Sequence, residues 1–277
     1  MKEGLKFYKY HGAGNDFIMI DNRGECFDVK DVEKIKFLCH RRFGIGADGM
    51  QIVQNHPDYD FEMIFVNSDG SMGSMCGNGG RCIVHYAHYV LKMIKDPKHV
   101  KFLAPDGEHE AEINEEIIRL KMRDMANVTE RNGLPFVYCG TTPHNIKFVE
   151  NLENFPVFPE GKKLRYSDPD GVNANYVEIK NGVFNVRTYE RGVEDETMAC
   201  GTAATSVAII SHKLGILKEN ICHIKMPGGN LTVEFEPCVR QDLTTYKNIW
   251  LTGPAVCVFE GKIRLSVNLV LRLLSTK

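Results

Sequence analysis

The 277-residue chain has no apolar run long enough to span a bilayer, and no apolar segment follows its N-terminal lysines as in a secretory signal. It also lacks an excess of positive charge, because 34 Lys and Arg residues are balanced by 36 Asp and Glu residues and no basic cluster stands out. These absences argue against a membrane protein and against a nucleic-acid surface. We therefore expect a cytoplasmic protein that binds a small neutral or zwitterionic molecule.

Paired metal-ligand motifs are absent too, since the sequence contains no Cys-x-x-Cys and no His-x-x-x-His. This makes a metal site a weak interpretation. Nine cysteines without a signal segment favour free thiols over a disulfide framework. Free cysteine usually behaves as a small buried apolar residue. We expect that behaviour of Cys26, Cys39, Cys139, Cys222, Cys238 and Cys257.

Short strand-forming runs separated by glycine turns dominate the pattern of the chain. The clearest strands are expected over 17–20, 61–66, 117–122, 183–189, 231–235 and 255–259. Helical periodicity predicts only three main helices, over 29–42, 80–95 and 202–217. This distribution predicts an α+β fold with antiparallel sheets and one prominent helix in each half.

The two halves of the sequence resemble each other. A strand, a turn and a Cys-Gly pair that opens a helix occur at Cys76 and again at Cys200, 124 residues later. The turn at 104–107 is echoed at 226–229, an offset of 122 residues. Two ordered features at nearly equal offsets predict a duplicated unit, with its boundary in the polar stretch near 122–133.

A cysteine at the mouth of a helix meets unsatisfied N–H groups and the positive end of the helix dipole. That position is expected to lower the thiol pKa. The same N–H groups can hold a carboxylate, and we expect four of them, from Gly77, Asn78, Gly201 and Thr202, to do so.

Two such sites suit the inversion of an amino-acid α-carbon. Removal of the α-proton places negative charge on the carboxylate, where converging helix dipoles stabilise it without pyridoxal phosphate or another cofactor. Inversion needs a base on one face and an acid on the other. The sequence therefore predicts a cofactor-independent racemase or epimerase that uses Cys76 and Cys200.

Other interpretations of the two cysteines stay open at this point. Each can be a small buried residue without chemistry. Two reactive thiols that meet in space can also form a redox pair, although the usual redox motif is missing. Such a protein would cycle through a disulfide with a physiological reductant, whereas an epimerase would simply be inactivated by oxidation.

Four motifs together closely resemble the diaminopimelate epimerase family. They are His11-Gly12-Ala13-Gly14-Asn15-Asp16-Phe17, Gly44-Ile45-Gly46-Ala47-Asp48, Met75-Cys76-Gly77-Asn78-Gly79-Gly80-Arg81-Cys82, and Tyr189-Glu190-Arg191-Gly192 with Ala199-Cys200-Gly201-Thr202. The likeness runs from about residue 6 to about residue 265. It implies interconversion of L,L- and meso-diaminopimelate, on the route to lysine and peptidoglycan, without metal or pyridoxal phosphate.

The resemblance also implies an architecture of two pseudo-symmetric domains, each a mostly antiparallel sheet or barrel around a central helix. The first half is expected to comprise residues 1–121 plus 254–277, and the second residues 122–253. A homodimer is a further implication.

Carried over residue by residue, the resemblance implies a thiolate–thiol pair of Cys76 and Cys200, assisted by His144 and Glu190. Without it, His144 would be interpreted as a structural histidine, and Glu190 beside Arg191 as a surface ion pair. The substrate-binding positions implied by the family are Asn15, Asn67, Gly77, Asn78, Thr142, Asn173, Arg191, Gly201 and Thr202.

The sequence departs from the family in several places. Thr142 stands where an Asn is usual, Ala203 where a Gly is usual, and 266–277 extend past the usual family end. Proline and hydroxyproline racemases and the phenazine-synthesis isomerase are rival activities on the same scaffold. Asn78 after the first Cys-Gly, and the separation of Glu190-Arg191 from the second cysteine, argue against the proline-type relatives.

Overall fold

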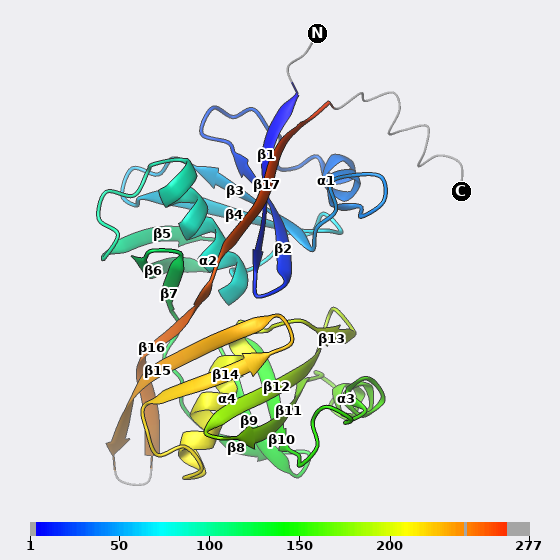
Figure 1. Cartoon of the computed structure of the whole chain (residues 1–277), viewed down its shortest axis with the longest axis vertical. Helices are drawn as coiled ribbons and strands as arrows, with labels where there is room; N and C mark the ends of the chain where they lie inside the picture. Colours follow the sequence, from blue (N-terminus) through cyan, green and yellow to red (C-terminus); the bar gives the residue numbers. More distant parts are fainter. Residues whose placement is uncertain (1–3, 241–242, 265–277) are drawn as a thin grey trace.

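Two lobes of similar topology, each a curved sheet around a central helix, make up the computed structural model, which describes residues 4–240 and 243–264 (Figure 1). The first lobe contains β1 (Leu5–Gly12), β2 (Asn15–Asp21), α1 (Val32–Cys39), β3 (Gly49–Gln54), β4 (Phe61–Asn67), α2 (Gly77–His85), the π-helical turn η1 (Tyr86–Val90), β5 (Val100–Ala104), β6 (Gly107–Asn114), β7 (Ile117–Lys121) and β17 (Val256–Ile263). The second lobe contains β8 (Thr129–Arg131), β9 (Leu134–Cys139), β10 (Thr142–Phe148), α3 (Val157–Tyr166), β11 (Asn173–Lys180), β12 (Val183–Glu190), β13 (Asp195–Thr197), α4 (Gly201–Lys213), β14 (Ile221–Met226), β15 (Gly229–Arg240) and β16 (Leu243–Pro254).

The strand order is the same in the two lobes. Neighbouring strands run β17-β1-β2-β3-β4-β5-β6-β7 in the first lobe and β8-β9-β10-β11-β12-β14-β15-β16 in the second. The last strands, β7 and β16, pair with each other and join the lobes. The α+β fold with two pseudo-symmetric units is therefore confirmed, including the equivalent turns at 104–107 and 226–229, which each connect two paired strands.

The sheets are mostly antiparallel, but each lobe also has two parallel pairs. These pairs are β2–β3 and β4–β5 in the first lobe, and β10–β11 and β12–β14 in the second. Parallel neighbours require a crossover connection, and each of these four crossovers contains a helix. The parallel pairs thus place α2 and α4 at equivalent positions in the two lobes.

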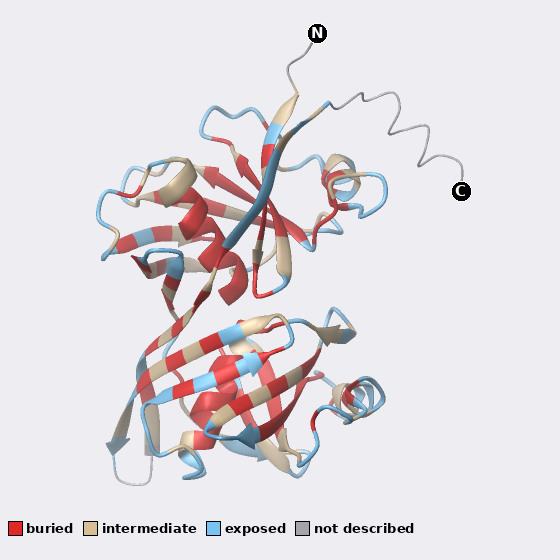
Figure 2. Cartoon of the chain, in the orientation of Figure 1, coloured by how far each residue is buried: buried red, intermediate tan, exposed pale blue. Residues whose placement is uncertain are grey.

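The central helices lie inside their lobes and are largely buried, as Figure 2 shows. All nine residues of α2 are buried, and so are ten of the thirteen residues of α4. Helix α4 is rich in small and apolar residues on all sides, a composition typical of a helix that is surrounded by protein. No helix among the described residues is both long and apolar enough to cross a bilayer.

The helix bounds differ from the expected ones in an informative way. Helix α2 begins at Gly77 rather than at residue 80, and after residue 85 it continues as the π-helical turn η1 instead of a regular helix. Both central helices therefore begin directly after a candidate cysteine. Helix α1 begins later than expected because Asp31 caps it, accepting a hydrogen bond from the N–H of Lys34, and it ends at Cys39 because His40 is already extended. Helix α3 was not expected, since its first turn contains a proline and its N-cap residue is another.

Strand β17 returns from the second lobe and pairs with β1. In the second lobe β8 holds the equivalent place beside β9. The expected division into 1–121 plus 254–277 and 122–253 remains a prediction. Residues 265–277, which include the extension at 266–277, lie outside the described residues.

Candidate active site

The N-termini of the two central helices meet at the centre of the molecule. A methyl group built on Gly77 would lie 3.4 Å from the Cα atom of Gly201, and one built on Gly201 would lie 3.2 Å from the Cα atom of Gly77. The same two methyl groups would come within 2.7 and 2.8 Å of Cδ2 of Leu251, on β16. Glycine at both positions lets the positive ends of α2 and α4 face a common point.

Cys76 and Cys200 are the N-cap residues of these helices, both in extended conformation. The Cys76 sulfur accepts a hydrogen bond from the N–H of Gly79, with a donor–acceptor distance of 3.2 Å. The Cys200 sulfur instead lies 3.3 Å from the hydroxyl oxygen of Thr202. The helix ends thus hold the two cysteines as a pair, with different local hydrogen bonding.

The expectation of lowered thiol pKa values is wrong for this structure. Burial raises the pKa of Cys76, although the Gly79 N–H and the Arg81 charge act in the opposite direction. Burial, together with the nearby Glu190 carboxylate, raises the pKa of Cys200 well above its ordinary value. The loss of water around the thiols outweighs the favourable helix ends.

Glu190 is a partner of Cys200 rather than part of a surface ion pair. Its carboxylate accepts a short hydrogen bond from the Thr197 hydroxyl. Burial raises the pKa of Glu190, while the hydrogen bonds from Thr197 and Cys200 lower it. A carboxylate that can hold a proton therefore lies beside the second candidate thiol.

His144 is fully buried on β10. Its Nδ1 atom lies 3.2 Å from Nδ2 of Asn175, which also donates to the backbone oxygens of Asn145 and Asn173. The Asn175 amide is fixed in this direction because its oxygen accepts from the Thr188 hydroxyl. Nδ1 of His144 is therefore the acceptor, and the proton of the neutral ring resides on Nε2.

The Nε2 atom of His144 is buried without a hydrogen-bond partner among the described residues. Burial lowers the pKa of His144 to about 3, and the positive charge of Arg191 acts in the same direction. The ring is thus a neutral donor with a free N–H group. A buried donor of this kind is costly unless a ligand uses it.

Asn173 and Arg191 are linked through the backbone. The Asn173 side-chain oxygen accepts from the N–H of Arg191 at 2.8 Å, and the Arg191 guanidinium donates to the carbonyl of Asp170 at 2.8 Å. Arg191 is exposed, so its remaining donors are open to solvent or a ligand.

Asn78 connects the two lobes. Its amide nitrogen donates to the carbonyl of Ala199, the residue before Cys200, at 2.9 Å, and lies 3.5 Å from the side-chain oxygen of Asn15. Its own oxygen accepts from the guanidinium of Arg81 at 2.9 Å. The first Cys-Gly motif is thereby tied to the second.

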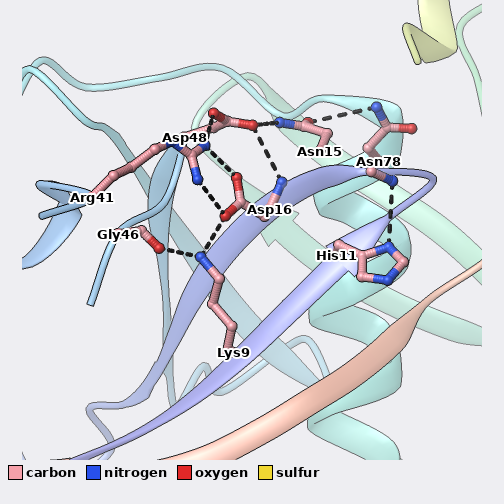
Figure 3. A network of polar contacts seen from close by, with 9 residues as sticks. Lys9, His11, Asn15, Asp16, Arg41, Gly46, Asp48 and Asn78 are labelled. Atoms are coloured by element: carbon pink, nitrogen blue, oxygen red, sulfur yellow. Dashed lines mark hydrogen bonds and ion pairs between the residues drawn. The ribbon is translucent and has the colours of Figure 1, made fainter. Parts of the chain in front are cut away.

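Asn15 belongs to the polar network of Figure 3. Its amide nitrogen donates to Asp48 at 2.7 Å, and Asp48 also pairs with the guanidinium of Arg41 at 2.6 Å. Arg41 in turn binds Asp16, which Lys9 contacts from the other side. The carboxylate of Asp48 therefore fixes the Asn15 amide so that its oxygen points towards Asn78.

Asn67 and Thr142 are the candidate residues with the fewest links to the others. The Asn67 amide donates to the Ser71 hydroxyl within its own turn, at 3.0 Å. Thr142 begins β10, two residues before His144, and its backbone pairs with Cys139. Asn67 thus lies at the end of β4 in the first lobe and Thr142 at the start of β10 in the second lobe, and among the described residues neither side chain is hydrogen-bonded to another candidate residue.

All nine cysteines are free, but three of the six expected to be buried are not. Cys39, Cys139 and Cys222 are buried, whereas Cys238 is partly buried and Cys26 and Cys257 are exposed. The described residues hold no group of three or more His, Cys, Asp or Glu side chains arranged as a metal site.

The diaminopimelate epimerase family model matches this chain twice, over residues 7–128 and 136–257. This chain belongs to the diaminopimelate epimerase family. The diaminopimelate epimerase of Flavobacterium psychrophilum is 46% identical over 94% of this chain and 100% of the relative. That of Chlorobaculum tepidum is 40% identical over 92% of this chain and 99% of the relative.

Solved structures show how widely this family's fold is shared. A phenazine biosynthesis protein of the PhzF family from Bacillus anthracis matches with a TM-score of 0.69 at 16% identity, covering 96% of this chain and 100% of that one. A hydroxyproline epimerase from Agrobacterium vitis matches with a TM-score of 0.68 at 16% identity, covering 95% and 93%. At this identity the likeness extends to the fold alone.

Arg81 belongs to the Met75–Cys82 motif, and its sequence context predicted no role for it. Its guanidinium is fully buried and donates to the carbonyls of Gly77 and Pro254 as well as to Asn78. Burial lowers its pKa to about 10. The available signal was a charged residue directly after the glycine-rich start of a helix that is buried along its whole length, because a buried cation needs specific partners.

Proposed function

We propose that the protein interconverts L,L- and meso-diaminopimelate by a two-base mechanism at Cys76 and Cys200. The observation that carries the proposal is the contact between two helix N-termini, each preceded by a cysteine. Family membership supports the same substrate. The protein is accordingly an isomerase of the lysine route.

In the proposed reaction the substrate α-carboxylate lies between the two helix ends, near the N–H groups of Gly77, Asn78, Gly201 and Thr202. One cysteine, as thiolate, removes the α-proton, and the electron pair of the broken C–H bond moves into the carboxylate. The helix ends stabilise the added charge. The other cysteine, as thiol, delivers its proton to the opposite face of the carbon, and the roles exchange in the reverse direction.

Glu190 and His144 are proposed to assist the thiols. Glu190 accepts a hydrogen bond from Cys200, so it can hold the thiol proton when Cys200 is to act as base. The unpartnered Nε2–H group of His144 offers a neutral donor that can stabilise a thiolate.

The distal amino-acid group of the substrate is proposed to bind Arg191 through its carboxylate. The amide oxygens of Asn15, Asn67 and Asn173 are proposed to accept from its ammonium, with the Thr142 hydroxyl at the edge of this shell. The fixed amide of Asn15, which presents its oxygen, supports this arrangement.

The catalytic unit is proposed to comprise two halves, 1–121 plus 254–277 and 122–253, and its pairing of β17 with β1 supports that division. A homodimer is proposed as well, and the exposed Val258 and Phe259 on β17 offer an apolar edge for it. The cytoplasm is the proposed location, because its reducing conditions keep the two thiols free.

The deciding experiment is incubation of the reduced protein with L,L-diaminopimelate in deuterated water without added cofactor. Deuterium should enter the α-carbon as meso-diaminopimelate forms, and its absence would refute the proposal. Cys76→Ala and Cys200→Ala should each abolish turnover, whereas Cys139→Ala, which removes another buried thiol, should not. Full activity in either of the first two variants would contradict the two-base assignment, and disulfide-linked turnover with a reductant would favour the redox alternative.

A further inference from the structure

Gln51 is a polar residue in the middle of β3 that faces the apolar interior of the first lobe. Its neighbours Met50 and Ile52 point to the other face of the sheet, where they pack with residues of α1, while Val53 shares the face of Gln51 and joins the core around α2. Gln51 is fully buried. Neither its amide nitrogen nor its amide oxygen has a hydrogen-bond partner among the described residues.

The Gln51 amide lies beside the first turn of α2. A methyl group built on Gly79 would come within 2.1 Å of Nε2 of Gln51 and within 3.1 Å of the Cys76 sulfur. The amide nitrogen and the sulfur therefore flank the same point above Gly79. Glycine at this position is what lets the amide approach the helix mouth.

A buried primary amide without partners destabilises a fold, because its hydrogen bonds to water are lost and nothing replaces them. An apolar side chain would fill this core position better. A polar side chain at this position is explained if the amide of Gln51 gains a hydrogen-bond acceptor during the reaction that is absent in the resting state. The Cys76 sulfur is the reactive atom beside the amide, and a thiolate is a much stronger acceptor than a thiol.

We propose that Gln51 is a positioning residue for Cys76, and that its amide N–H group donates a hydrogen bond to the Cys76 sulfur when that sulfur is a thiolate. The Gly79 N–H already donates to the sulfur, and the Gln51 amide would add a side-chain donor to the backbone donors of the helix end. The hydrogen bond favours the charged form and offsets part of the effect of burial. The inference rests on the proposed role of Cys76 as a base.

Other groups also act on Cys76, and the test must hold them constant. Arg81 on α2 lowers its pKa and Glu190 on β12 raises it. Cys82 lies one turn and a half further along α2, and Asp106 accepts from the backbone N–H of Met75. Gln51 is uncharged, so its replacement changes none of these charges.

The test is the Gln51→Met variant, which keeps the volume of the side chain but removes both polar atoms. Gln54→Met, on the same strand, is the matched control. In the Cys200→Ala background, alkylation of Cys76 by iodoacetamide is followed against pH by peptide mass spectrometry, which separates it from the other cysteines. The alkylation measurement uses no substrate, so its result does not depend on which substrate the enzyme acts on.

A lost hydrogen bond to a charged group should raise the apparent pKa of Cys76 by about one to two units, and slow its alkylation at pH 7 by roughly 10- to 100-fold. The melting temperature should stay equal or rise by about 2–4 °C. An unchanged pH profile of alkylation in Gln51→Met would overturn the proposal. If that variant fails to fold, Gln51→Leu gives the same reading, since it too removes the amide. Lack of deuterium exchange with diaminopimelate, by contrast, would overturn the proposed function and leave the alkylation result standing.

Discussion

The contact between Gly77 and Gly201 can be tested by adding one methyl group at a time. In Gly201→Ala the new Cβ atom would lie 3.2 Å from the backbone Cα of Gly77 and 2.8 Å from Cδ2 of Leu251. In Gly77→Ala the backbone distance is an ordinary 3.4 Å, and only the Leu251 contact, at 2.7 Å, is too close. A side-chain end can move, whereas a helix backbone cannot without shifting its helix.

The magnitudes follow from this difference. Overpacking in a core costs about 1–3 kcal/mol, which for a protein of this size lowers the melting temperature by several degrees. A displacement of reacting groups approaching 1 Å costs about 100-fold in rate. We expect Gly201→Ala to lower kcat/KM by about 10- to 100-fold, and Gly77→Ala to lower it less.

Leu251→Val is a second test of this contact, because it removes the Cδ2 atom that the methyl groups at both positions would meet. Combined with Gly77→Ala it should restore most of the activity, whereas combined with Gly201→Ala it should restore only part. Gly24→Ala is the control, since a methyl group there would meet nothing within 4 Å. The assay is initial epimerase rate together with thermal unfolding followed by circular dichroism.

One result would refute the reasoning directly. If Gly201→Ala retains the parent kcat/KM while its melting temperature is unchanged, the helix ends are not in the contact described, and their approach does not set the distance between the thiols. If Gly201→Ala lowers the melting temperature but not kcat/KM, the contact between the helix ends contributes to stability and not to catalysis.

Two further predictions concern the residues around the helix ends. Because burial lowers the pKa of His144 to about 3 from its ordinary 6.5, the unfolded chain binds a proton below pH 6.5 that the folded chain does not. The free energy of unfolding should therefore fall with decreasing pH below 6.5, by about 1.4 kcal/mol per pH unit from this group alone. In urea unfolding, His144→Gln should lose that part of the dependence of stability on pH. The same pH dependence in the variant and the parent protein would contradict this prediction. In Asp48→Asn the new amide can donate as well as accept, so Asn15 is no longer held with its oxygen towards the site. In Asp48→Asn, KM for diaminopimelate should rise about 10-fold with a smaller change in kcat. The control Asp21→Asn, which breaks the remote pair with Arg23, should leave KM and kcat unchanged. Equal effects of the two variants would rule out the proposed role of Asp48.

The repeated Cys-Gly motif was sufficient to predict much of this protein. Helix mouths at Cys76 and Cys200 follow from local chemistry, because a Cys-Gly pair before a helical run is a local pattern. The nearly equal offsets of two features predicted the duplication, and the fold confirms it through the same strand order in both lobes. The family resemblance added His144 and Glu190 to the predicted site, whereas composition and spacing alone would have assigned them to structural roles.

What the sequence did not determine depends on contacts between distant segments. The expected thiol pKa values were wrong because the helix end is a local feature, whereas burial depends on how the two lobes enclose the sulfur atoms. Helix α3 was missed because its prolines outweigh its weak periodicity, although packing on β11 and β12 stabilises it.

The partners of individual side chains were equally beyond the sequence. Glu190 and Arg191 are adjacent in the chain, but their side chains bind Thr197 and the Asp170 carbonyl instead of each other. Gln51 appears in the sequence as one polar residue in an apolar strand, and only the tertiary structure places it beside Gly79 and Cys76. The sequence by itself determined that the Cys-Gly motif occurs twice, once at the start of each central helix, and it predicted which residues carry the chemistry. The tertiary structure decided how close the two copies lie, what surrounds each thiol and which polar groups remain without partners, because these properties depend on packing between segments that are far apart in the sequence.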